Sequence, residues 1–419
     1  MTTHLNALTA AQIRDGQHPA HGMAAAKTGP SAFPAGGDTR PGDADVIAAH
    51  PELPGLAILL DPLELARVSG ERWGEPLRLE RLRLKPGASV SALLRPVSGE
   101  GPRALARGFA QDPWETKRHK DLRSAADSGL PGWEIPEGQL VLVPAAADRK
   151  LKGLAALRPD TGVEVRVAGR QVTVYTLSHN PGRRFVGLID PLNRQNLHLN
   201  GSPTGIAPSQ ATPSGHGMQE LAADTGMDRL VLRLHSDRRR EILPWTPGRP
   251  WQPGDPAPAT PATPAESNGL PFMNLPDMLA AAVAGLQMLS PVWGERAAAI
   301  VTEISGRLGA VDRVPAHGDF SHDQVVVDDS EPGTTRLTIL DWDRMGLWPS
   351  GWDAATWTAG LLVTGWHPGD GSCALDEPVA PEVLAAAAVL RGPEPFRRRH
   401  PTWADCTDLL LAHAERALT

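Results

Sequence analysis

The first half of the chain alternates apolar and polar residues in short segments separated by turns. Residues 77–84 largely alternate Leu with charged residues, and a Lys-Pro-Gly turn separates them from the apolar-rich residues 90–97. A period of two indicates a half-exposed strand, and Pro-Gly favours a turn. The same unit recurs at 172–177 and 184–189, around an Asn-Pro-Gly turn. We expect a hairpin at each place; duplication and chance explain the repeat equally well. Further strands are predicted at 104–109, 230–234 and 240–243.

The second half of the chain has the spacing of helices. In residues 275–289, Leu279, Val283 and Leu286 fall on one side, which is the apolar stripe of an amphipathic helix. A strand-rich first half followed by a helix-rich second half predicts an α+β fold. Other helices are expected at 62–66, 115–127, 297–308, 354–363, 381–390 and 403–418.

Composition divides the chain into five parts. Residues 1–45 are rich in Ala, Gly and Pro with little periodicity, so we expect them to be mostly disordered apart from a short helix at Ala10–Arg14. A connection rich in Pro and Ala, which we expect to be flexible, covers residues 251–270. The remaining parts are an α+β region at 46–170, which is an extra or duplicated unit, a strand region at 171–250 and a helical region at 271–419.

The most informative segment is His317-Gly318-Asp319-Phe320-Ser321-His322-Asp323-Gln324, which leads into the β-branched run 325–327. A turn-rich stretch and a second strand at 337–340 follow, and then Asp341-Trp342-Asp343. Opposed residues of an antiparallel pair lie about 4.5–5.5 Å apart. Gln324 just before the first strand is therefore expected near Asp341 just after the second.

This pair of oxygen donors suits a magnesium ion. Mg²⁺ prefers oxygen ligands and is often held by only one or two protein carboxylates together with phosphates and water. Asp319 stands five residues before Gln324, in the spacing His-x-Asp-x-x-x-x-Asn of a kinase catalytic loop, with Gln in place of Asn. The segment therefore predicts a site for phosphoryl transfer.

The two motifs, His317 to Gln324 and Leu340-Asp341-Trp342-Asp343, resemble those of the aminoglycoside phosphotransferase and choline kinase group. The resemblance implies a two-lobed protein-kinase-like fold and transfer of the γ-phosphoryl group of ATP or GTP to a hydroxyl of a small polar acceptor. Aminoglycosides, other antibiotics, sugars and amino alcohols are acceptors in that group. Asp319 would orient the hydroxyl and take its proton, Gln324 and Asp341 would hold Mg²⁺, and Asp353 would brace the catalytic loop.

The nucleotide end of the site departs from this pattern. Kinases place a Lys on the third strand of the N-terminal lobe, and this chain has no Lys after Lys152. Counting from the first hairpin, Arg107 takes that place. In the second hairpin, Asn180-Pro181-Gly182-Arg183-Arg184 resembles a turn of the group's nucleotide-binding lobe, so residues 171–250 are expected to form that lobe. Arg107 and Arg184 are therefore the candidates to bind the nucleotide.

Several neighbouring residues have a less specific interpretation. Arg344 is expected to pair with a nearby acid, although contact with phosphate is the alternative. Asp323 and Asp343 fit solvated or capping positions as well as metal ligation, and His317 and His322 are expected to be structural. Trp348, Trp352, Trp357 and Trp366 are candidates for the acceptor pocket, with packing in the core as the favoured interpretation.

Charge and cysteine content narrow the class of protein. The formal net charge of −7 is spread along the chain, which argues against a nucleic-acid binder. Cys373 and Cys406 form neither a disulfide framework nor a zinc pattern, so a reducing cytoplasm is expected. No apolar run approaches the roughly 20 residues that span a bilayer, and no signal peptide is recognisable. The expected partners are a nucleotide and a small hydroxyl-bearing molecule, without a membrane.

Two alternatives remain open from the sequence. A non-catalytic kinase-like protein, retaining the fold and nucleotide binding, is favoured by the missing Lys and opposed by the retained Asp319 and Asp341. A metal-dependent hydrolase would use His317, Asp319, His322 and Asp341, and would need a transition metal but no nucleotide.

Overall fold

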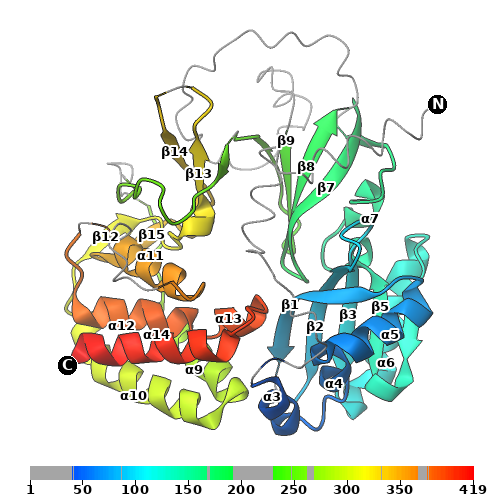
Figure 1. Cartoon of the computed structure of the whole chain (residues 1–419), viewed down its shortest axis with the longest axis horizontal. Coiled ribbons are helices and arrows are strands. Elements are labelled where there is room, and N and C mark those ends of the chain that lie inside the picture. Colours follow the sequence, from blue (N-terminus) through cyan, green and yellow to red (C-terminus); the bar gives the residue numbers. More distant parts are fainter. Residues whose placement is uncertain are drawn as a thin grey trace.

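The computed structural model describes residues 40, 42–85, 87–167, 170–191, 230–246, 248–261, 269–331, 333–366, 375 and 377–419. The predicted helix at Ala10–Arg14 and Cys373 lie outside these residues. Within them the fold is α+β, with a strand-rich first half and a mainly helical second half, which confirms the expected fold class (Figure 1).

The first sheet is five-stranded and antiparallel, in the order β1-β2-β3-β5-β4. Leu105 and Phe109 of β3 pack with Trp114 of helix α6, while Ala104 and Ala106 belong to the core formed with α4 and α5. Helices thus cover both faces of β3, so the strand is buried throughout. The elements of this unit are α3 (Asp43–Ala49), α4 (Gly55–Leu60), α5 (Pro62–Trp73), β1 (Leu77–Lys85), β2 (Ser89–Pro96), β3 (Ala104–Phe109), α6 (Gln111–Asp127), β4 (Trp133–Ile135) and β5 (Leu140–Pro144). Two 3₁₀ turns, η1 (Pro136–Gly138) and η2 (Ala145–Ala147), and the short helix α7 (Leu154–Leu157) complete it.

The second sheet is also five-stranded and antiparallel, in the order β10-β9-β8-β7-β6. Phe185, Leu232 and Val174 form part of its small apolar core, together with Leu154 of α7. Both predicted Pro-Gly hairpins are confirmed, as β1–β2 in the first sheet and β7–β8 in the second. Its strands are β6 (Val165–Val167), β7 (Arg170–Asn180), β8 (Arg184–Pro191), β9 (Leu230–His235) and β10 (Arg240–Pro244).

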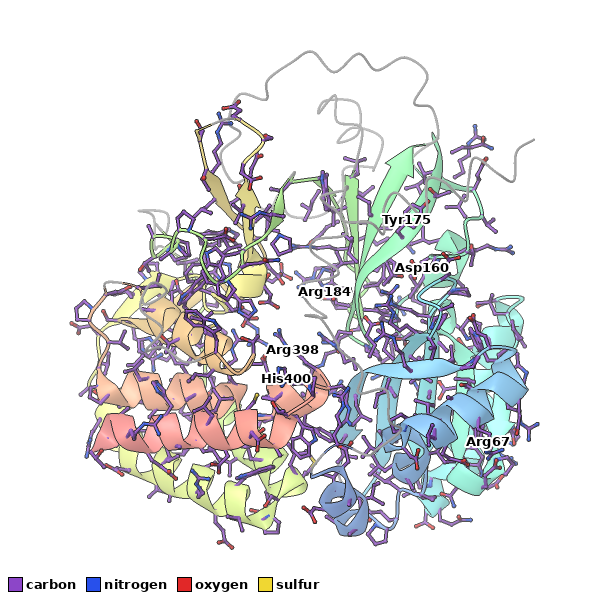
Figure 2. The ribbon with its side chains drawn as sticks, viewed as in Figure 1. Arg67, Asp160, Tyr175, Arg184, Arg398 and His400 are labelled. Carbon is purple, nitrogen blue, oxygen red and sulfur yellow. The ribbon has the colours of Figure 1, made fainter. Side chains whose placement is uncertain are left out.

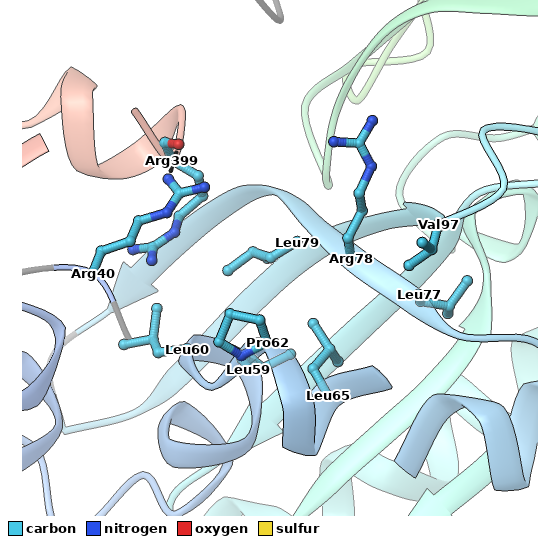
Figure 3. Close-up of a pocket in the computed structure, with 10 residues that line it drawn as sticks. All are labelled: Arg40, Leu59, Leu60, Pro62, Leu65, Leu77, Arg78, Leu79, Val97 and Arg399. Carbon is cyan, nitrogen blue, oxygen red and sulfur yellow. Dashed lines mark hydrogen bonds between the residues drawn. The ribbon is translucent and has the colours of Figure 1, made fainter. Parts of the chain in front are cut away.

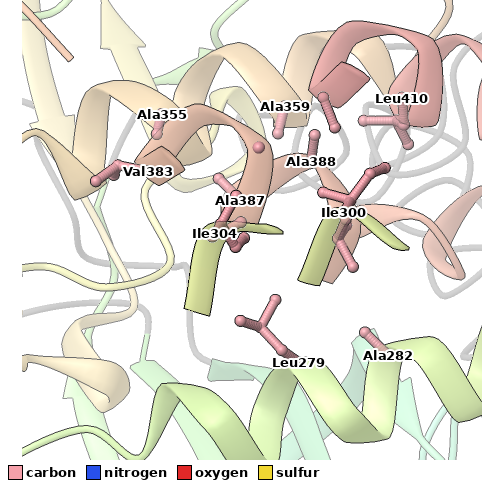
Figure 4. Close-up of a cluster of buried hydrophobic side chains, with 14 of the residues drawn as sticks. Leu279, Ala282, Ile300, Ile304, Ala355, Ala359, Val383, Ala387, Ala388 and Leu410 are labelled. Atoms are coloured by element: carbon pink, nitrogen blue, oxygen red, sulfur yellow. The ribbon is translucent and has the colours of Figure 1, made fainter. Parts of the chain in front are cut away.

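The helical half packs around α12, whose residues Ala385 to Ala388 are fully buried. These small side chains allow α9, α10, α11 and α14 to approach α12 from several sides, and Ile300, Ile304 and Leu410 fill the space between them (Figure 4). Its helices are α9 (Leu275–Leu289), α10 (Pro291–Leu308), α11 (Trp352–Leu362), α12 (Pro381–Arg391), α13 (Glu394–Arg397) and α14 (Trp403–Leu418). Its strands and 3₁₀ turns are β11 (Arg249–Pro250), β12 (Arg313–Ala316), η3 (His322–Gln324), β13 (Val325–Asp328), β14 (Arg336–Ile339), η4 (Trp342–Arg344) and β15 (Gly346–Pro349).

The start of the Pro- and Ala-rich connection packs against the helical half. Strand β11 pairs with β13, and the side chain of Trp251 is buried, with its ring centre 5.0 Å from that of Trp357. This part of the connection is therefore fixed to the hairpin β13–β14. None of the helices in the described part of the chain has the length and apolarity needed to cross a bilayer.

The first unit also packs directly on the helical half. Leu289, Phe396 and Trp403 belong to the same apolar cluster as α3, α4 and the first sheet. Asp43 of α3 is buried beside Arg399, whose guanidinium donates two hydrogen bonds to it at 3.0 and 2.6 Å. The two units therefore share one core, as the position of α3 below α13 in Figure 1 illustrates.

Candidate active site

The loop between β12 and β13 carries Asp319 and is fixed by Asp353 at the start of α11. The carboxylate of Asp353 accepts hydrogen bonds from the backbone N–H groups of His317 (2.8 Å) and Gly318 (2.9 Å). Burial raises the pKa of Asp353, although these two hydrogen bonds oppose the shift. Asp353 thus holds the loop as the resemblance implies.

Gly318 occupies a position that only glycine fits. Its φ is +82°, and a Cβ atom there would overlap Nε1 of Trp348 and the carbonyl oxygen of Arg344, well inside van der Waals contact. The backbone of Gly318 can approach these groups because it has no side chain, and this close approach sets the position of the adjacent Asp319.

His317 makes the structural contacts that were expected of it. Nε2 of His317 lies 2.8 Å from the carbonyl oxygen of Leu340, and the buried ring packs on Trp342 with centres 4.7 Å apart. His317 therefore connects the loop that carries Asp319 to the end of β14. Burial lowers the pKa of His322, so the neutral form of its ring is favoured.

The hairpin brings Gln324 and Asp341 to the same end of two paired strands. Val325 pairs with Ile339, and the backbone N–H of Leu340 donates to the carbonyl oxygen of Gln324 at 2.8 Å. Asp341 follows with φ 67° and ψ 52°, a left-handed conformation that is uncommon outside glycine. Such strained residues cluster at functional sites. A shared cation between Gln324 and Asp341 stays a prediction.

Two arginines of the second sheet contact the carboxylates after β14. Arg184 of β8 donates to both oxygens of Asp341, at 2.8 and 2.9 Å, and to Asp343 at 2.8 Å. Arg233 of β9 lies 3.2 Å from Asp343 and 3.8 Å from Asp341. Burial disfavours the charged form of Arg184, but attraction to the two carboxylates outweighs it and raises the pKa. Arg184 thus lies between the second sheet and the helical half (Figure 2).

The catalytic candidate Asp319 is paired on its other side. Nη2 of the buried Arg391, the last residue of α12, donates to Oδ1 of Asp319 at 2.6 Å, and Nη1 donates to Glu394 at 2.9 Å. Arg344 lies 3.8 Å from Oδ2 of Asp319, so it pairs with an acid as expected. Burial opposes the charge on Arg391, yet Glu394 and Asp319 raise its pKa. Asp319 is therefore held in place by a buried arginine.

The ion pairs continue from Glu394 to Asp323, in the loop that carries Asp319. Arg398 donates to Asp323 at 3.0 Å and lies 3.0 Å from Glu394, while the hydroxyl of Ser321 donates to Asp323 at 2.6 Å. Burial favours the neutral form of Glu394, but Arg391 and Arg398 lower its pKa to about 2. Asp323 therefore belongs to the ion-pair network that includes Arg398 and Glu394.

Sequence reasoning missed three arginines of the site: Arg233, Arg391 and Arg398. Arg391 and Arg398 show the spacing of helical ion pairs with Glu394, three and four residues away. The spacing of these two arginines from Glu394 can be recognised in the sequence. Their links to Asp319 and Asp323 join residues that are distant in sequence, and no local pattern encodes them.

Arg107 lies in a closed network of its own. It donates to Asp121 of α6 at 2.7 Å and to Asp148 at 2.8 Å, and all three side chains are buried. Asp148 also accepts from the backbone N–H of Gly182 and contacts His179. Although burial favours the neutral acid, His179 and Arg107 hold the pKa of Asp148 well below its usual range. Binding of nucleotide by Arg107 stays a prediction.

Basic side chains gather where the first sheet, the β7–β8 turn and α13 meet. Burial, followed by repulsion from Arg183 and Arg397, lowers the pKa of Arg83 on β1. Lys150 is similarly affected, since burial, Lys85 and Arg107 lower its pKa. Like charges disfavour one another's charged forms, which is the direction of both shifts.

The tryptophans follow the favoured interpretation and belong to the core. Trp348, Trp352 and Trp357 are buried, and the stacked rings of Trp348 and Trp352 have centres 4.6 Å apart. Trp366 packs on the apolar cluster around Trp357. Trp352 donates a hydrogen bond to the carbonyl oxygen of Gly318 at 3.2 Å, and the three buried side chains are not accessible to an acceptor.

The described residues contain no group of three or more His, Cys, Asp or Glu side chains arranged to hold a metal ion.

No protein-family model and no curated protein matches the chain. The solved structures similar to it include the following kinases. A choline kinase from Cryptosporidium parvum Iowa II is 8% identical over 59% of this chain and 89% of that chain, with a TM-score of 0.32. A Plasmodium vivax ethanolamine kinase is 8% identical over 82% of each chain, with a TM-score of 0.26. A glucosamine kinase is 16% identical over 82% of this chain and 88% of that chain, with a TM-score of 0.21.

Proposed function

We propose that this protein transfers the γ-phosphoryl group of ATP or GTP to a hydroxyl group of a small polar molecule. One observation carries the proposal: Asp319 in a braced loop and Asp341 after the adjacent hairpin are both partly buried carboxylates held by arginines. Phosphoryl transfer relies on positioning and on charge neutralisation, and this arrangement supports both.

The donor atoms at the end of the hairpin fit Mg²⁺. Asp341 contributes a carboxylate and Gln324 an amide oxygen, and two protein ligands suffice when phosphates and water supply the rest. An ion held by Asp341 and Gln324 would supply positive charge for the phosphates of the nucleotide. In the structure Arg184 neutralises Asp341, so a cation and this guanidinium compete for the same oxygens.

The basic residues around the site favour a polyphosphate. Arg184 and Arg233 approach the carboxylates from the second sheet, while Arg83, Arg183 and Arg397 repel one another nearby. A nucleotide triphosphate relieves this repulsion and gives Arg184 an anionic partner once the cation occupies Asp341. Guanidinium groups bind phosphate through two parallel hydrogen bonds, which orients the chain of phosphates.

Asp319 has the geometry to orient the acceptor. Arg391 binds Oδ1 of Asp319, which leaves Oδ2 with only the distant Arg344 among its described contacts. Oδ2 would accept a hydrogen bond from the acceptor hydroxyl and then its proton. A carboxylate within hydrogen-bond reach of the hydroxyl is what this step requires.

A screen of hydroxylated small molecules tests the proposal. Purified protein with Mg²⁺ and ATP or GTP should add the mass of one phosphate to at least one sugar, amino alcohol or aminoglycoside. Asp319→Asn should abolish this gain without changing the unfolding curve. The matched control is Asp329→Asn on the turn of the same hairpin, where the exposed Asp329 contacts only Arg249 among its described partners. An Asp319→Asn protein as active as the control would remove Asp319 from its role.

A non-catalytic nucleotide-binding protein is the second candidate. It is favoured because arginines already satisfy both Asp319 and Asp341. Nucleotide binding that does not depend on Mg²⁺, with no transfer to any acceptor, would support it. The hydrolase alternative fits less well, because both ring nitrogens of His317 contact the backbone, at Leu340 and at Asp319.

A location in the reducing cytoplasm is part of the proposal. Cys406 is a free, buried thiol, and burial raises its pKa, so the unreactive protonated form is favoured. The proposed partners remain a nucleotide and a small acceptor.

A further inference from the structure

A series of ion pairs leaves the loop that carries Asp319 and returns to the same loop at Asp323. Arg391 donates to Oδ1 of Asp319 at 2.6 Å and to Glu394 at 2.9 Å. Arg398 lies 3.0 Å from Glu394 and donates to Asp323 at 3.0 Å. The series therefore connects two acids of one loop through side chains at the end of α12, in α13 and directly after it.

The backbone that carries Arg391 is fixed by its neighbours. The carbonyl oxygen of Gly392 accepts a buried hydrogen bond from the hydroxyl of Thr407 in α14 at 3.2 Å. A Cβ atom at Gly392 would lie 3.0 Å from both terminal methyl carbons of Leu286, so this turn packs closely on α9. The ring of Pro393 holds the next φ at −76°. The position of the guanidinium of Arg391 therefore depends on its side-chain torsions and on the two acids that it contacts.

The contact with Arg391 selects one orientation of the carboxylate of Asp319. The last torsion of an aspartate side chain has a broad distribution when nothing holds it. The side chain of Arg391 is 7% exposed and binds Oδ1, whereas that of Asp319 is 27% exposed. The nearest described partner of Oδ2 is Arg344, at 3.8 Å. Oδ1 is therefore occupied, and Oδ2 is the oxygen that can meet a substrate.

We propose that Arg391 is a positioning residue for phosphoryl transfer, which holds Oδ1 of Asp319 so that Oδ2 faces the acceptor hydroxyl. Glu394 fixes the plane of the guanidinium, because the two N–H donors of the fork point along set directions. The inference rests on the proposed function, since it assigns a role within the same reaction. Arg391 acts through Asp319 and contacts no substrate.

The reaction shows why this orientation matters. The acceptor oxygen forms a bond to the γ-phosphorus, the bond from that phosphorus to the bridging oxygen breaks, and the nucleoside diphosphate leaves. The hydroxyl proton passes to Oδ2 of Asp319. Misplacement of a reacting group by about 1 Å can lower the rate by about 10²-fold. A loss of orientation at Asp319 should therefore lower turnover without a matching change in nucleotide binding.

Initial-rate kinetics of Arg391→Lys, with ATP or GTP, Mg²⁺ and an acceptor found by the screen, test the inference. Lysine keeps the positive charge but cannot hold Asp319 and Glu394 in one rigid plane. We expect kcat to fall by about 10- to 100-fold, while the KM for the nucleotide changes by less than about two-fold. An unaltered protein that phosphorylates no acceptor would overturn the proposed function and this inference together.

Arg399→Lys is the matched control, because Arg399 is also a buried arginine with two hydrogen bonds to acidic oxygens. It donates to both oxygens of Asp43, at 3.0 and 2.6 Å. It also borders a cavity beside α4, α5 and β1, and none of the described residues that line this cavity is proposed for catalysis (Figure 3). Urea unfolding should show a loss of stability in both variants, whereas kcat should fall only in Arg391→Lys. If the unaltered protein is active and the two variants have equal kcat, this inference alone is overturned.

Glu394→Gln provides a second test that leaves Arg391 in place. The amide accepts a hydrogen bond but has no charge, so it holds the guanidinium less firmly. We expect kcat to fall by about three- to ten-fold, and the double variant should lose little more than Arg391→Lys alone, because both residues act through one contact. Losses that add fully would overturn the part assigned to Glu394. Where Arg391→Lys fails to fold, a Glu394→Gln protein as active as the unaltered one would overturn the whole inference.

Discussion

The two five-stranded sheets each carry an arginine that joins two carboxylates, but these arginines connect different parts of the molecule. Arg107 on β3 of the first sheet pairs with Asp121 and Asp148, which lie within the first unit. Arg184 on β8 of the second sheet pairs with Asp341 and Asp343, which lie in the helical half. The side chain of Arg107 is 9% exposed and that of Arg184 is 28% exposed.

The buried Arg107 is placed to stabilise the fold, whereas the more exposed Arg184 can contact a ligand. Breaking a buried ion pair leaves an unpaired charge and costs several kcal/mol. A partly exposed pair is worth less and can exchange partners with water, a cation or a phosphate. Sequence alone presented Arg107 and Arg184 as equal candidates, whereas their burial and partners distinguish them.

The largest expected effect is on catalysis at Asp341. Asp341→Asn keeps the shape of the side chain but removes the charge that would hold Mg²⁺, so transfer should fall by about 10³-fold or more. Asp343→Asn is the matched control, because Asp343 also pairs with Arg184 yet has no assigned role. It should lose less than about ten-fold. Steady-state rates at saturating Mg²⁺ measure both, and equal losses would contradict the assignment.

Arg107→Met should destabilise the protein by about 3–5 kcal/mol, because it leaves Asp121 and Asp148 buried without their partner. Arg184→Met should cost less than about 1 kcal/mol, since its pairs are partly exposed. Urea unfolding at neutral pH measures both. Similar losses in the two variants would remove the distinction between the sheets.

Arg184→Met should instead change ligand binding. Without the competing guanidinium, Mg²⁺ should bind more tightly in the absence of nucleotide, while the KM for the nucleotide should rise by roughly ten-fold. Magnesium titration and initial-rate kinetics measure the two effects. Arg239→Met, on the exposed turn between β9 and β10, serves as the control, because Arg239 pairs only with Asp237 among its described partners. A KM equal to that of the control would refute a role in nucleotide binding.

The smallest expected effect is a change in the pH dependence of stability at His322. Burial lowers the pKa of this base below its unfolded value of about 6.5, so the unfolded chain binds more protons at acidic pH. The contribution of His322 to stability is therefore complete above pH 6.5 and is lost as the pH falls below it. The slope is at most about 1.4 kcal/mol per pH unit for one proton.

His322→Gln should flatten the fall in unfolding free energy between pH 7 and pH 5. His400 and His413 also have pKa values lowered by burial, so part of the slope should remain. His413→Gln, in helix α14, is a useful comparison. A slope in His322→Gln identical to that of the unaltered protein would show that folding does not change the pKa of His322.

Periodicity predicted the elements that are long or strongly alternating. The helix at residues 275–289 and the strand at 104–109 are confirmed within the predicted bounds. Helix α10 begins at Pro291, six residues before the predicted start at 297, because proline is favoured in the first turn although it breaks helices elsewhere. Strand β5 (Leu140–Pro144) was not predicted, since a short apolar run does not separate strand from helix. The short helices α3 and α4 depend on contacts with the rest of the fold.

The site was predictable where its residues are close in sequence. Asp319, Gln324 and Asp353 stand in a recognisable order, and the hairpin places Asp341 from its register alone. The contacts of Arg233 with Asp343 and of Arg391 with Asp319 depend on how strands and helices distant in sequence pack, so no spacing reveals these contacts. The acidic residues of the site can thus be placed from local sequence, whereas the positions of its arginines depend on the tertiary fold.

The contact of Asp43 with Arg399 and Trp403 affects which truncated fragments of this protein can fold. Trp403 donates to Asp43 at 3.0 Å beside the paired Arg399, so residues near both ends of the described chain share one buried counter-ion. A fragment made of the helical half alone would leave Arg399 without that acid and would present Phe396 and Trp403 to water. The smallest portion that folds by itself and carries Asp319 therefore includes helix α3, and a chain shortened to residues 271–419 should aggregate.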